Sequence, residues 1–288
     1  MTLLTPRPLG RTGLHVTPLG LAAMSVRGRG AQGKLTADEV ERAYHEQGIN
    51  TFLVHFMMRE VCEGVRRLIQ SGHRDKLVLA SEVALPFSGS VRRGLEKHLR
   101  ILGTDHLDLW LIGWVRRRWY VREGVWSEMK RLRESGKTRA IGFSCHDRPL
   151  AAALARELPV DVLMIRYNAA HRGAEREIFE PLAAMGAERP GIIAYTATRW
   201  GMLLHPLPRA GFTEAMTGPE CYRFALGHPM VDLAWCAARS GEELRQDVDG
   251  VLAGPLEPSR LEEVRRFGDA VHAAARGGFR WMFGSSSR

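Results

Sequence analysis

The feature that most constrains the fold of this chain is a regular alternation of two patterns along its length. Short apolar runs, typical of buried strands, alternate with amphipathic segments that have the period of a helix. The spacing from one run to the next is about 30 residues, the size of a strand–helix unit. This order predicts parallel strands joined by crossover helices.

The predicted elements extend over nearly the whole chain. The first helix has clear start and stop signals, since Thr36 and Glu39 form a capping box and Gly48 ends it. Strands are expected at 15–23, 50–56, 76–83, 107–112, 139–143, 161–167, 191–195 and 231–235. Helices are expected at 36–48, 60–70, 90–102, 122–135, 149–158, 174–185, 220–226 and 241–251, with an additional one at 259–275.

Eight strands can close into a barrel, which leaves no exposed sheet edge. The 288 residues suffice, because an α/β barrel typically needs about 250. We therefore predict one α/β domain over residues 1–276, a (β/α)8 TIM barrel with an N-terminal β-hairpin at 8–16 and an extra C-terminal helix. Residues 277–288 are expected to be a tail. The chemistry of such barrels lies on the loops that follow the strands.

Composition narrows the choice of partners. The net charge of +9 favours an anionic partner, but the basic residues are spread over helix faces, and only 116–120 form a dense basic run. The four cysteines lack CxxC spacing, so no metal site is indicated. No stretch has the length of a membrane span, and no secretory signal is visible. We expect a cytoplasmic protein that binds a small molecule and neither nucleic acid nor membrane, with its oligomeric state open.

Residues 28–33 match the G-x-G-x-x-G pattern of dinucleotide-binding loops. In that fold an acidic residue at the end of the next strand binds the ribose. Residues 51–55, Thr-Phe-Leu-Val-His, provide none. We therefore interpret the glycines as an ordinary loop between a strand and a helix.

Several segments, in the same order along the chain, resemble the aldo-keto reductase family. They are residues 8–14, 48–52, 102–109, 136–144 and 193–195. The resemblance implies a barrel whose hairpin plugs the bottom, and reduction of carbonyl groups by NADPH. It also implies a tetrad in which a tyrosine protonates the carbonyl oxygen, a lysine lowers the pKa of the tyrosine, an aspartate pairs with the lysine and a histidine orients the substrate.

The four tetrad positions carry other residues in this sequence. The resemblance places Leu53 at the aspartate position, Met58 at the tyrosine, Glu82 at the lysine and Gly113 at the histidine. Leucine, methionine and glycine side chains have no proton to transfer at neutral pH, and a carboxylate normally accepts one. We therefore expect ordinary ketone reduction to be feeble or absent.

The resemblance implies an NADP(H) site that is better preserved than the tetrad. Tyr195 corresponds to the aromatic residue on which the nicotinamide stacks, and Thr196 follows it. Ser144 matches a residue that binds the nicotinamide amide, whereas Cys145 and Met164 replace an asparagine and a glutamine.

At the other end of the cofactor, Arg239 and Ser240 lie where the family binds the 2′-phosphate. A guanidinium group suits phosphate because it can form two parallel hydrogen bonds. The phosphate end of the site is therefore expected to be closer to the family pattern than the nicotinamide end.

Other polar residues follow the predicted strands and could replace the missing chemistry. Glu82, His55 and His146 are the candidate catalytic groups, because an imidazole or a perturbed carboxyl can exchange protons near neutral pH. The candidate lining of the substrate pocket is Trp114, Asn168, Arg199 and Trp200.

Three functions remain open from the sequence. The first is a divergent NADP(H)-binding oxidoreductase without the tyrosine-based mechanism. The second is a catalytically inactive pseudoenzyme whose barrel binds a ligand. The third is an acid–base enzyme of the isomerase or lyase type that needs no cofactor.

Overall fold

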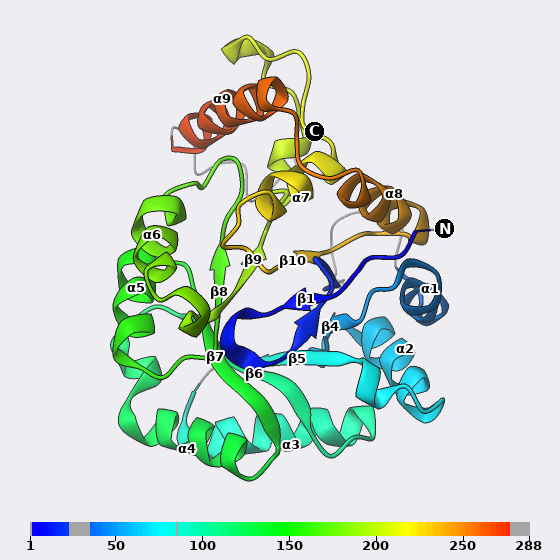
Figure 1. Ribbon diagram of the computed structural model, residues 1–288, viewed down its shortest axis with the longest axis vertical. Helices are drawn as coiled ribbons and strands as arrows, with labels where there is room; N and C mark the ends of the chain where they lie inside the picture. The colour runs from blue at the N-terminus through cyan, green and yellow to red at the C-terminus, as the bar shows by residue number, and fades with distance from the viewer. Residues whose placement is uncertain (1, 23–34, 85, 277–288) are drawn as a thin grey trace, which may run out of the picture.

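The computed structural model describes residues 2–22, 35–84 and 86–276. Their strands form a closed parallel barrel in the order β10-β3-β4-β5-β6-β7-β8-β9, surrounded by helices (Figure 1). The predicted (β/α)8 barrel is confirmed. The glycine pattern at 28–33 and the tail at 277–288 lie outside the described residues.

The barrel strands are mostly short and fully buried. In chain order they are β3 Leu19–Leu21, β4 Thr51–Leu53, β5 Val78–Val83, β6 Leu107–Val115, β7 Thr138–Cys145, β8 Val162–Arg166, β9 Gly191–Tyr195 and β10 Leu233–Cys236. The helices are α1 Ala37–Gln47, α2 Arg59–Gln70, α3 Ser88–Leu102, α4 Glu123–Glu134, α5 Arg148–Glu157, α6 Glu180–Ala183, α7 Gly218–Leu226, α8 Gly241–Leu252 and α9 Pro258–Arg276.

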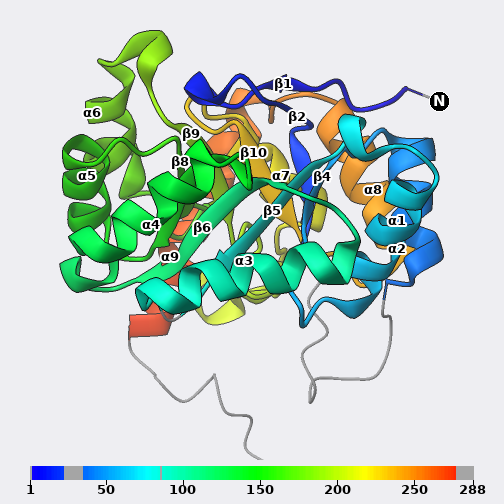
Figure 2. The same ribbon diagram turned by 90° about the horizontal axis from the view of Figure 1, so that it is seen from below.

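The predicted first strand, 15–23, is two separate strands. His15–Val16 is β2, which pairs antiparallel with β1, Arg7–Pro8, as the predicted hairpin. The barrel strand begins only at Leu19. Between them Pro18 has no N–H to donate, and the Thr17 amide donates instead to the Asn50 side chain at 2.9 Å. The hairpin lies across one end of the barrel, at the top of Figure 2.

The helix predicted at 174–185 is also irregular. It consists of a π-helical turn, Glu175–Phe179, followed by the short α6. Pro181 lies within the first turn of α6 and has no amide hydrogen, so it cannot continue the regular hydrogen-bond ladder. The capping box of Thr36 and Glu39 and the left-handed Gly48 at the end of α1 are confirmed.

Two buried aspartates fix the strands from the hairpin side. The Asp108 carboxylate in β6 accepts hydrogen bonds from Arg74, Arg139 and the amide of Leu79. Asp232, just before β10, pairs with Arg189 at 2.6 Å. A buried carboxylate is tolerated only when its oxygens are satisfied, so these ion pairs tie neighbouring βα units together.

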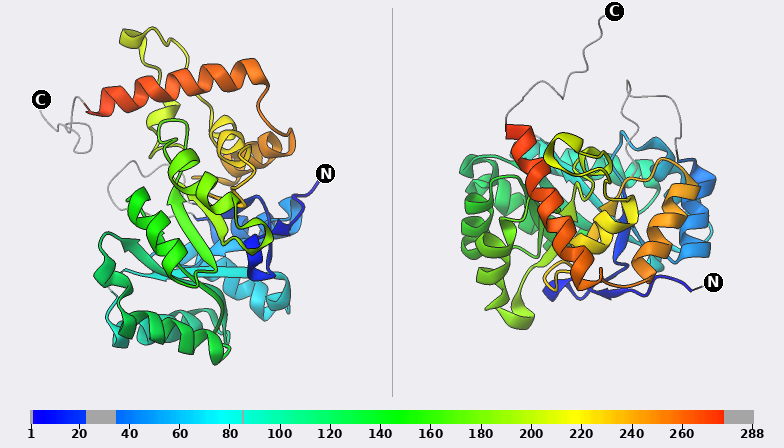
Figure 3. Two further views of the ribbon diagram at one scale, coloured as in Figure 1. Left: turned by 60° about the vertical axis from the view of Figure 1, so that its left-hand side comes forward. Right: turned by 90° about the horizontal axis from the view of Figure 1, so that it is seen from above.

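The additional helix α9 lies on the outside of the barrel near α7 (Figure 3). Its Arg260 bonds to Glu220 of α7, and its Arg265 pairs with Glu175 after β8. Phe267 packs on Phe212 with ring centres 5.3 Å apart. The helix therefore supports the loops that follow β8 and β9.

Candidate active site at the barrel rim

Glu82 lies near the C-terminal end of β5 and bonds to β7, two strands away in the barrel. The Ser144 hydroxyl on β7 donates to Oε2 of Glu82 at 3.3 Å. Ser144 itself accepts from the backbone amide of Trp114 at 2.7 Å. This chain of hydrogen bonds holds the carboxyl group in a fixed place at the rim.

Gly113 on β6 makes room for that carboxyl group. A Cβ atom added at Gly113 would lie 3.0 Å from both Cδ and Oε2 of Glu82. Real Cβ atoms rarely come so close to other atoms, so a larger residue at 113 would require Glu82 to move. Residues 82 and 113 are therefore sterically coupled in this chain.

The environment of Glu82 favours its neutral form. Burial raises its pKa from the usual 4.5 to about 7, against the smaller opposite effect of the Ser144 hydrogen bond. Within the described ranges no arginine or lysine forms an ion pair with it. Near neutral pH this carboxyl group can both give and accept a proton, which is the condition for general acid–base catalysis.

A cavity of about 380 Å³ opens at the rim. Its walls come from the ends of β6, β7 and β8 and from the loop after β9. The residues that line it are Val115, Arg116, His146, Asp147, Arg166 and Trp200. Two residues predicted from the sequence, His146 and Trp200, are among them.

Tyr195 at the end of β9 lies near both Glu82 and His146, which lines this cavity. Its ring meets that of His146 edge to face, with centroids 5.2 Å apart. Its hydroxyl is buried without a hydrogen-bond partner among the described residues. The pKa of Tyr195 is raised, mainly by burial and also by Cys145 and Glu82, while Arg166 acts in the opposite direction. All three groups are therefore close enough to the Tyr195 hydroxyl to influence its ionisation.

The rim loops carry the unusual backbone of the molecule. In the part of the chain that the structure describes, the non-glycine residues with positive φ are Trp114, Thr196, Arg199 and Trp200. All follow or end barrel strands at this face. Left-handed backbone at non-glycine residues costs free energy and gathers at functional sites, so this strain supports the rim as the working surface.

Asn168 and Arg199 have supporting positions in the loops after β8 and β9. The Asn168 amide donates to the Thr196 carbonyl at 2.8 Å, and its oxygen accepts from the Ala170 amide. Arg199 is only 7% exposed, and its Nε and Nη1 have no hydrogen-bond partner among the described residues. Neither lines the rim cavity, and neither does Trp114.

The predicted phosphate-binding residues lie after β10. The Arg239 side chain is 73% exposed and pairs with Glu243 at 3.1 Å. The Ser240 hydroxyl caps α8 by accepting from the Glu243 amide. The Arg239 and Gly241 amides bond to the Glu243 and Glu39 carboxylates, so a phosphate group would have to displace Glu243 from Arg239 to bind here.

The predicted nicotinamide end is largely occupied by internal contacts. The Trp235 indole donates to Sδ of Met164 at 3.1 Å inside the barrel. The Cys145 thiol donates to the carbonyls of Val115 and Asp147. Thr196 donates its hydroxyl to the Tyr195 carbonyl. Tyr195 is only 9% exposed and its ring contacts His146, and an amide group would find few free partners here.

His55 belongs to a different environment from Glu82 and His146. It follows β4 and packs against His98 of α3, with ring centroids 5.9 Å apart. Burial, His98 and Lys97 lower its pKa to about 4, so it is neutral at physiological pH. Its neighbours Leu53 and Met58 are buried apolar residues.

Arg116 and Arg166 were missed as candidates by the sequence analysis. Arg166 stands two residues beyond Met164 on β8, and side chains two apart on a strand point to the same side. Since Met164 faces the barrel interior, the same alternation could have placed Arg166 at the mouth. Nothing in the sequence distinguished Arg116 from its basic neighbours.

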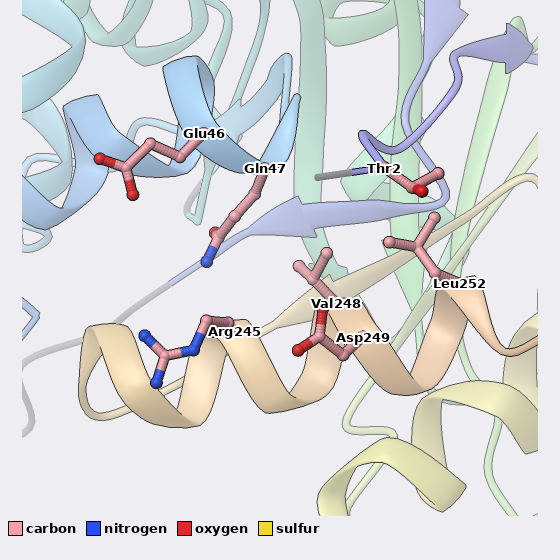
Figure 4. Close-up of a pocket in the computed structure, with 7 residues that line it drawn as sticks. All are labelled: Thr2, Glu46, Gln47, Arg245, Val248, Asp249 and Leu252. Carbon is pink, nitrogen blue, oxygen red and sulfur yellow. The ribbon is translucent and has the colours of Figure 1, made fainter.

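A second cavity, of about 260 Å³, lies on the flank of the barrel between α1, α8 and the N-terminal segment (Figure 4). Arg245 and Glu242 pair beside it on α8. Its walls come from helix sides rather than strand ends. The lining residues are Thr2, Glu46, Gln47, Arg245, Val248, Asp249 and Leu252.

The described residues contain no group of three or more His, Cys, Asp or Glu side chains placed to bind a metal ion. None of their helices combines the length and the apolar character needed to cross a bilayer. The four cysteines are buried and form no disulfide.

The fold has close counterparts among solved structures. The aldo-keto reductase AKR11C1 from Bacillus halodurans superimposes with a TM-score of 0.72 in its holo form and 0.68 in its apo form. Each comparison covers 93% of this chain and 96% of that one at 19% sequence identity, so it establishes the fold.

Sequence relatives point the same way. Aldo-keto reductase YhdN of Bacillus subtilis (strain 168) is 26% identical over 183 residues, 58% of this chain and 55% of that protein. The (1S)-1,7-diacetoxy-luvungin A aldo-keto reductase of Citrus sinensis is 30% identical over 145 residues, 39% of this chain and 45% of that protein. The matched part thus spans about half the length of these curated relatives. Residues 36–207, more than half of the chain, match the sequence profile of the Aldo/keto reductase family, and the protein therefore belongs to that family.

Proposed function

We propose that this protein is an NADP(H)-dependent oxidoreductase in which Glu82 moves the proton that a tyrosine moves in the usual tetrad. Membership of the aldo/keto reductase family supports the reaction class. The observation that carries the assignment is the buried Glu82 carboxyl at the rim, with a pKa of about 7 and space made for it by Gly113.

The residues of this chain would act as follows. When bound, the nicotinamide supplies or accepts the hydride. Protonated Glu82 gives its proton to the carbonyl oxygen as negative charge develops there, and the resulting carboxylate keeps its hydrogen bond from Ser144. A proton from solvent then restores Glu82. In the reverse direction the carboxylate takes the proton of the alcohol.

The residues at the two ends of the proposed cofactor site support NADP(H) to different degrees. The Tyr195 ring ends β9 beside the rim, and Arg239 with Ser240 forms an exposed phosphate-binding pair at α8. At the amide end, Ser144 keeps its hydroxyl engaged with Glu82. We therefore propose that phosphate contacts and ring stacking, more than amide hydrogen bonds, hold the cofactor.

A second candidate function is supported by that same amide end. Met164 is bonded to Trp235, and the Cys145 thiol is satisfied by backbone carbonyls, so the pocket lacks the usual amide partners. A carboxyl group with a pKa of about 7 could also catalyse an isomerisation or elimination without any cofactor. If the wild-type protein binds a ligand but catalyses no reaction, it is instead a pseudoenzyme.

The test is to titrate the purified protein with NADPH by calorimetry and to follow NADPH oxidation with a panel of aldehydes. We expect saturable binding, slow turnover, and a fall in kcat of about 10²–10⁴-fold in Glu82→Gln with unchanged NADPH affinity. Glu134→Gln, an exposed residue on α4, serves as the matched control.

Three outcomes separate the candidates. No heat of binding at millimolar NADPH would reject the cofactor and leave the acid–base enzyme. Binding without turnover would favour the pseudoenzyme. Turnover that is equal in wild type and Glu82→Gln would reject Glu82 as the proton donor.

We also propose a cytoplasmic location. The support is the set of four buried thiols, none of which forms a disulfide, since structural disulfides are common in secreted proteins and rare in the cytoplasm.

A further inference from the structure

The rim cavity has an excess of positive charge. Two of its lining residues, Arg116 and Arg166, are cationic, and only Asp147 is acidic. The Asp147 carboxylate caps α5 by accepting from the Leu150 amide and keeps its negative charge, so the two arginines exceed it by one positive charge. His146 adds no charge at neutral pH, since burial, Arg166 and Arg116 lower its pKa.

Arg166 is a cation of this cavity whose charge has no carboxylate partner among the described residues. It ends β8, is half-buried, and makes neither an ion pair nor a hydrogen bond with another described residue. Its neighbour Arg148 contrasts with it, because Arg148 pairs with Glu177 at 3.0 Å. A half-buried guanidinium without a carboxylate is unfavourable in the free protein and offers several donors to a ligand.

The surroundings of Arg166 strengthen the positive field. Arg199, in the loop after β9, is 7% exposed and has two nitrogens without a partner among the described residues. Both arginines act on His171, whose pKa is lowered to about 3 by burial and by the charges of Arg166 and Arg199. The next residue along the chain from Arg199, Trp200, forms a wall of the cavity.

We propose that the substrate of the rim site carries an anionic group, a carboxylate or a phosphate, that binds to Arg166. The proposal rests on the proposed function in that it names the substrate class of the same site. Arg116 and the aromatic faces of His146 and Trp200 complete the binding pocket.

Arg166 lies close to the residues around Glu82 along the rim. It pairs in register with Tyr195 of β9, and Met164, two residues earlier on the same strand, pairs with Ser144, which bonds to Glu82. Glu82 itself does not line the cavity, so the anionic group at Arg166 is the part of the substrate that the cavity specifies.

Binding can be tested without cofactor and without turnover, by calorimetry at fixed ionic strength. The probes are two pairs that differ in charge: 4-(hydroxymethyl)benzoate with 1,4-benzenedimethanol, and glycerol 3-phosphate with glycerol. We expect the charged member of at least one pair to bind more tightly, and the pair that responds identifies carboxylate or phosphate. Arg166→Met should weaken the binding of that anion about tenfold or more.

Two further variants act as controls. Arg166→Lys keeps the charge and should restore part of the affinity. Arg100→Met removes an exposed charge near the far end of α3 and should leave the affinity unchanged. Melting curves of all variants check that they are folded.

The proposal is overturned if both neutral probes bind as tightly as their anions, if Arg166→Met binds as wild type does, or if Arg100→Met loses as much affinity. Since the assay contains no NADPH, the anion-binding result can be interpreted even if the protein is not an oxidoreductase. Selective anion binding without NADPH oxidation would mean that the substrate class holds and the reaction class does not.

Discussion

The carboxyl group of Glu82 lies where a side chain at position 113 would begin. A Cβ atom on Gly113 would come within 3.0 Å of Oε2 of Glu82, and Ser144 holds that oxygen from the next strand. The identities of residues 82 and 113 are therefore linked: the acid is accommodated at the rim because the neighbouring strand has a glycine there.

This contact predicts a measurable coupling between the two positions. Gly113→Ala should lower the free energy of unfolding in the wild-type background, because the new methyl group displaces the buried carboxyl. In a Glu82→Ala background the same substitution should cost much less, giving a coupling of about 0.5–3 kcal/mol in urea unfolding. Equal costs in both backgrounds would show that the two residues do not compete for space.

The pH dependence of stability should report the raised pKa of Glu82. The folded state binds this proton more tightly than the unfolded state, since the pKa rises from 4.5 to about 7. The contribution of Glu82 to the free energy of unfolding therefore falls as the pH rises from 4.5 to about 7. Relative to wild type, Glu82→Gln should gain melting temperature between about pH 4.5 and pH 7 and then level off.

Thermal melts across that pH range check this prediction. Glu134→Gln, the same substitution at an exposed position on α4, is the control. A constant difference between Glu82→Gln and wild type would mean that Glu82 titrates alike in the folded and unfolded states.

The phosphate end of the proposed cofactor site predicts a preference for NADPH over NADH that depends on Arg239. Arg239→Ala should weaken NADPH binding about tenfold while changing NADH binding little, because only NADPH has the 2′-phosphate. Arg245→Ala removes another arginine that pairs with a glutamate on α8 and should alter neither affinity. A uniform loss for both cofactors in Arg239→Ala would place the 2′-phosphate elsewhere.

The ion pairs on the hairpin side predict a stability effect without a direct effect on the site. Asp108→Ala leaves the buried Leu79 amide without its acceptor and removes the carboxylate that pairs with Arg74. We expect a loss of about 3–5 kcal/mol in the free energy of unfolding, measured in urea. Asp105→Ala, on the exposed turn before β6, is the matched control and should change stability by well under 1 kcal/mol.

Local signals in the sequence were sufficient where neighbouring residues decide the structure. Thr36, Glu39 and Gly48 set the ends of α1 as predicted, because capping depends on residues a few positions apart. The π turn before Pro181 and the split between β2 and β3 were missed. In both cases a proline without an amide hydrogen stands at the irregularity, and beside Pro18 the Thr17 amide bonds to the side chain of Asn50, which is distant in sequence.

The candidate site likewise has residues that the sequence could predict and residues that only the fold reveals. Glu82, His146 and Trp200 were predicted at the rim, because residues that follow barrel strands must lie at that face. His55 also follows a strand, yet it turns toward His98 of α3. Arg166 was missed, because its importance lies in having no partner, which only the positions of all the nearby carboxylates reveal.

The amino-acid sequence alone could predict the barrel, the order of its strands and the residue types available at its mouth. It could do so because strand and helix periodicity and capping are local properties of the chain. The tertiary structure decided which of those residues meet: Glu82 with Gly113 and Ser144, and Arg166 with a cavity that has no free carboxylate. The pKa of a carboxyl and the charge of a cavity depend on burial and on neighbours distant in sequence, so they follow only from the packed fold.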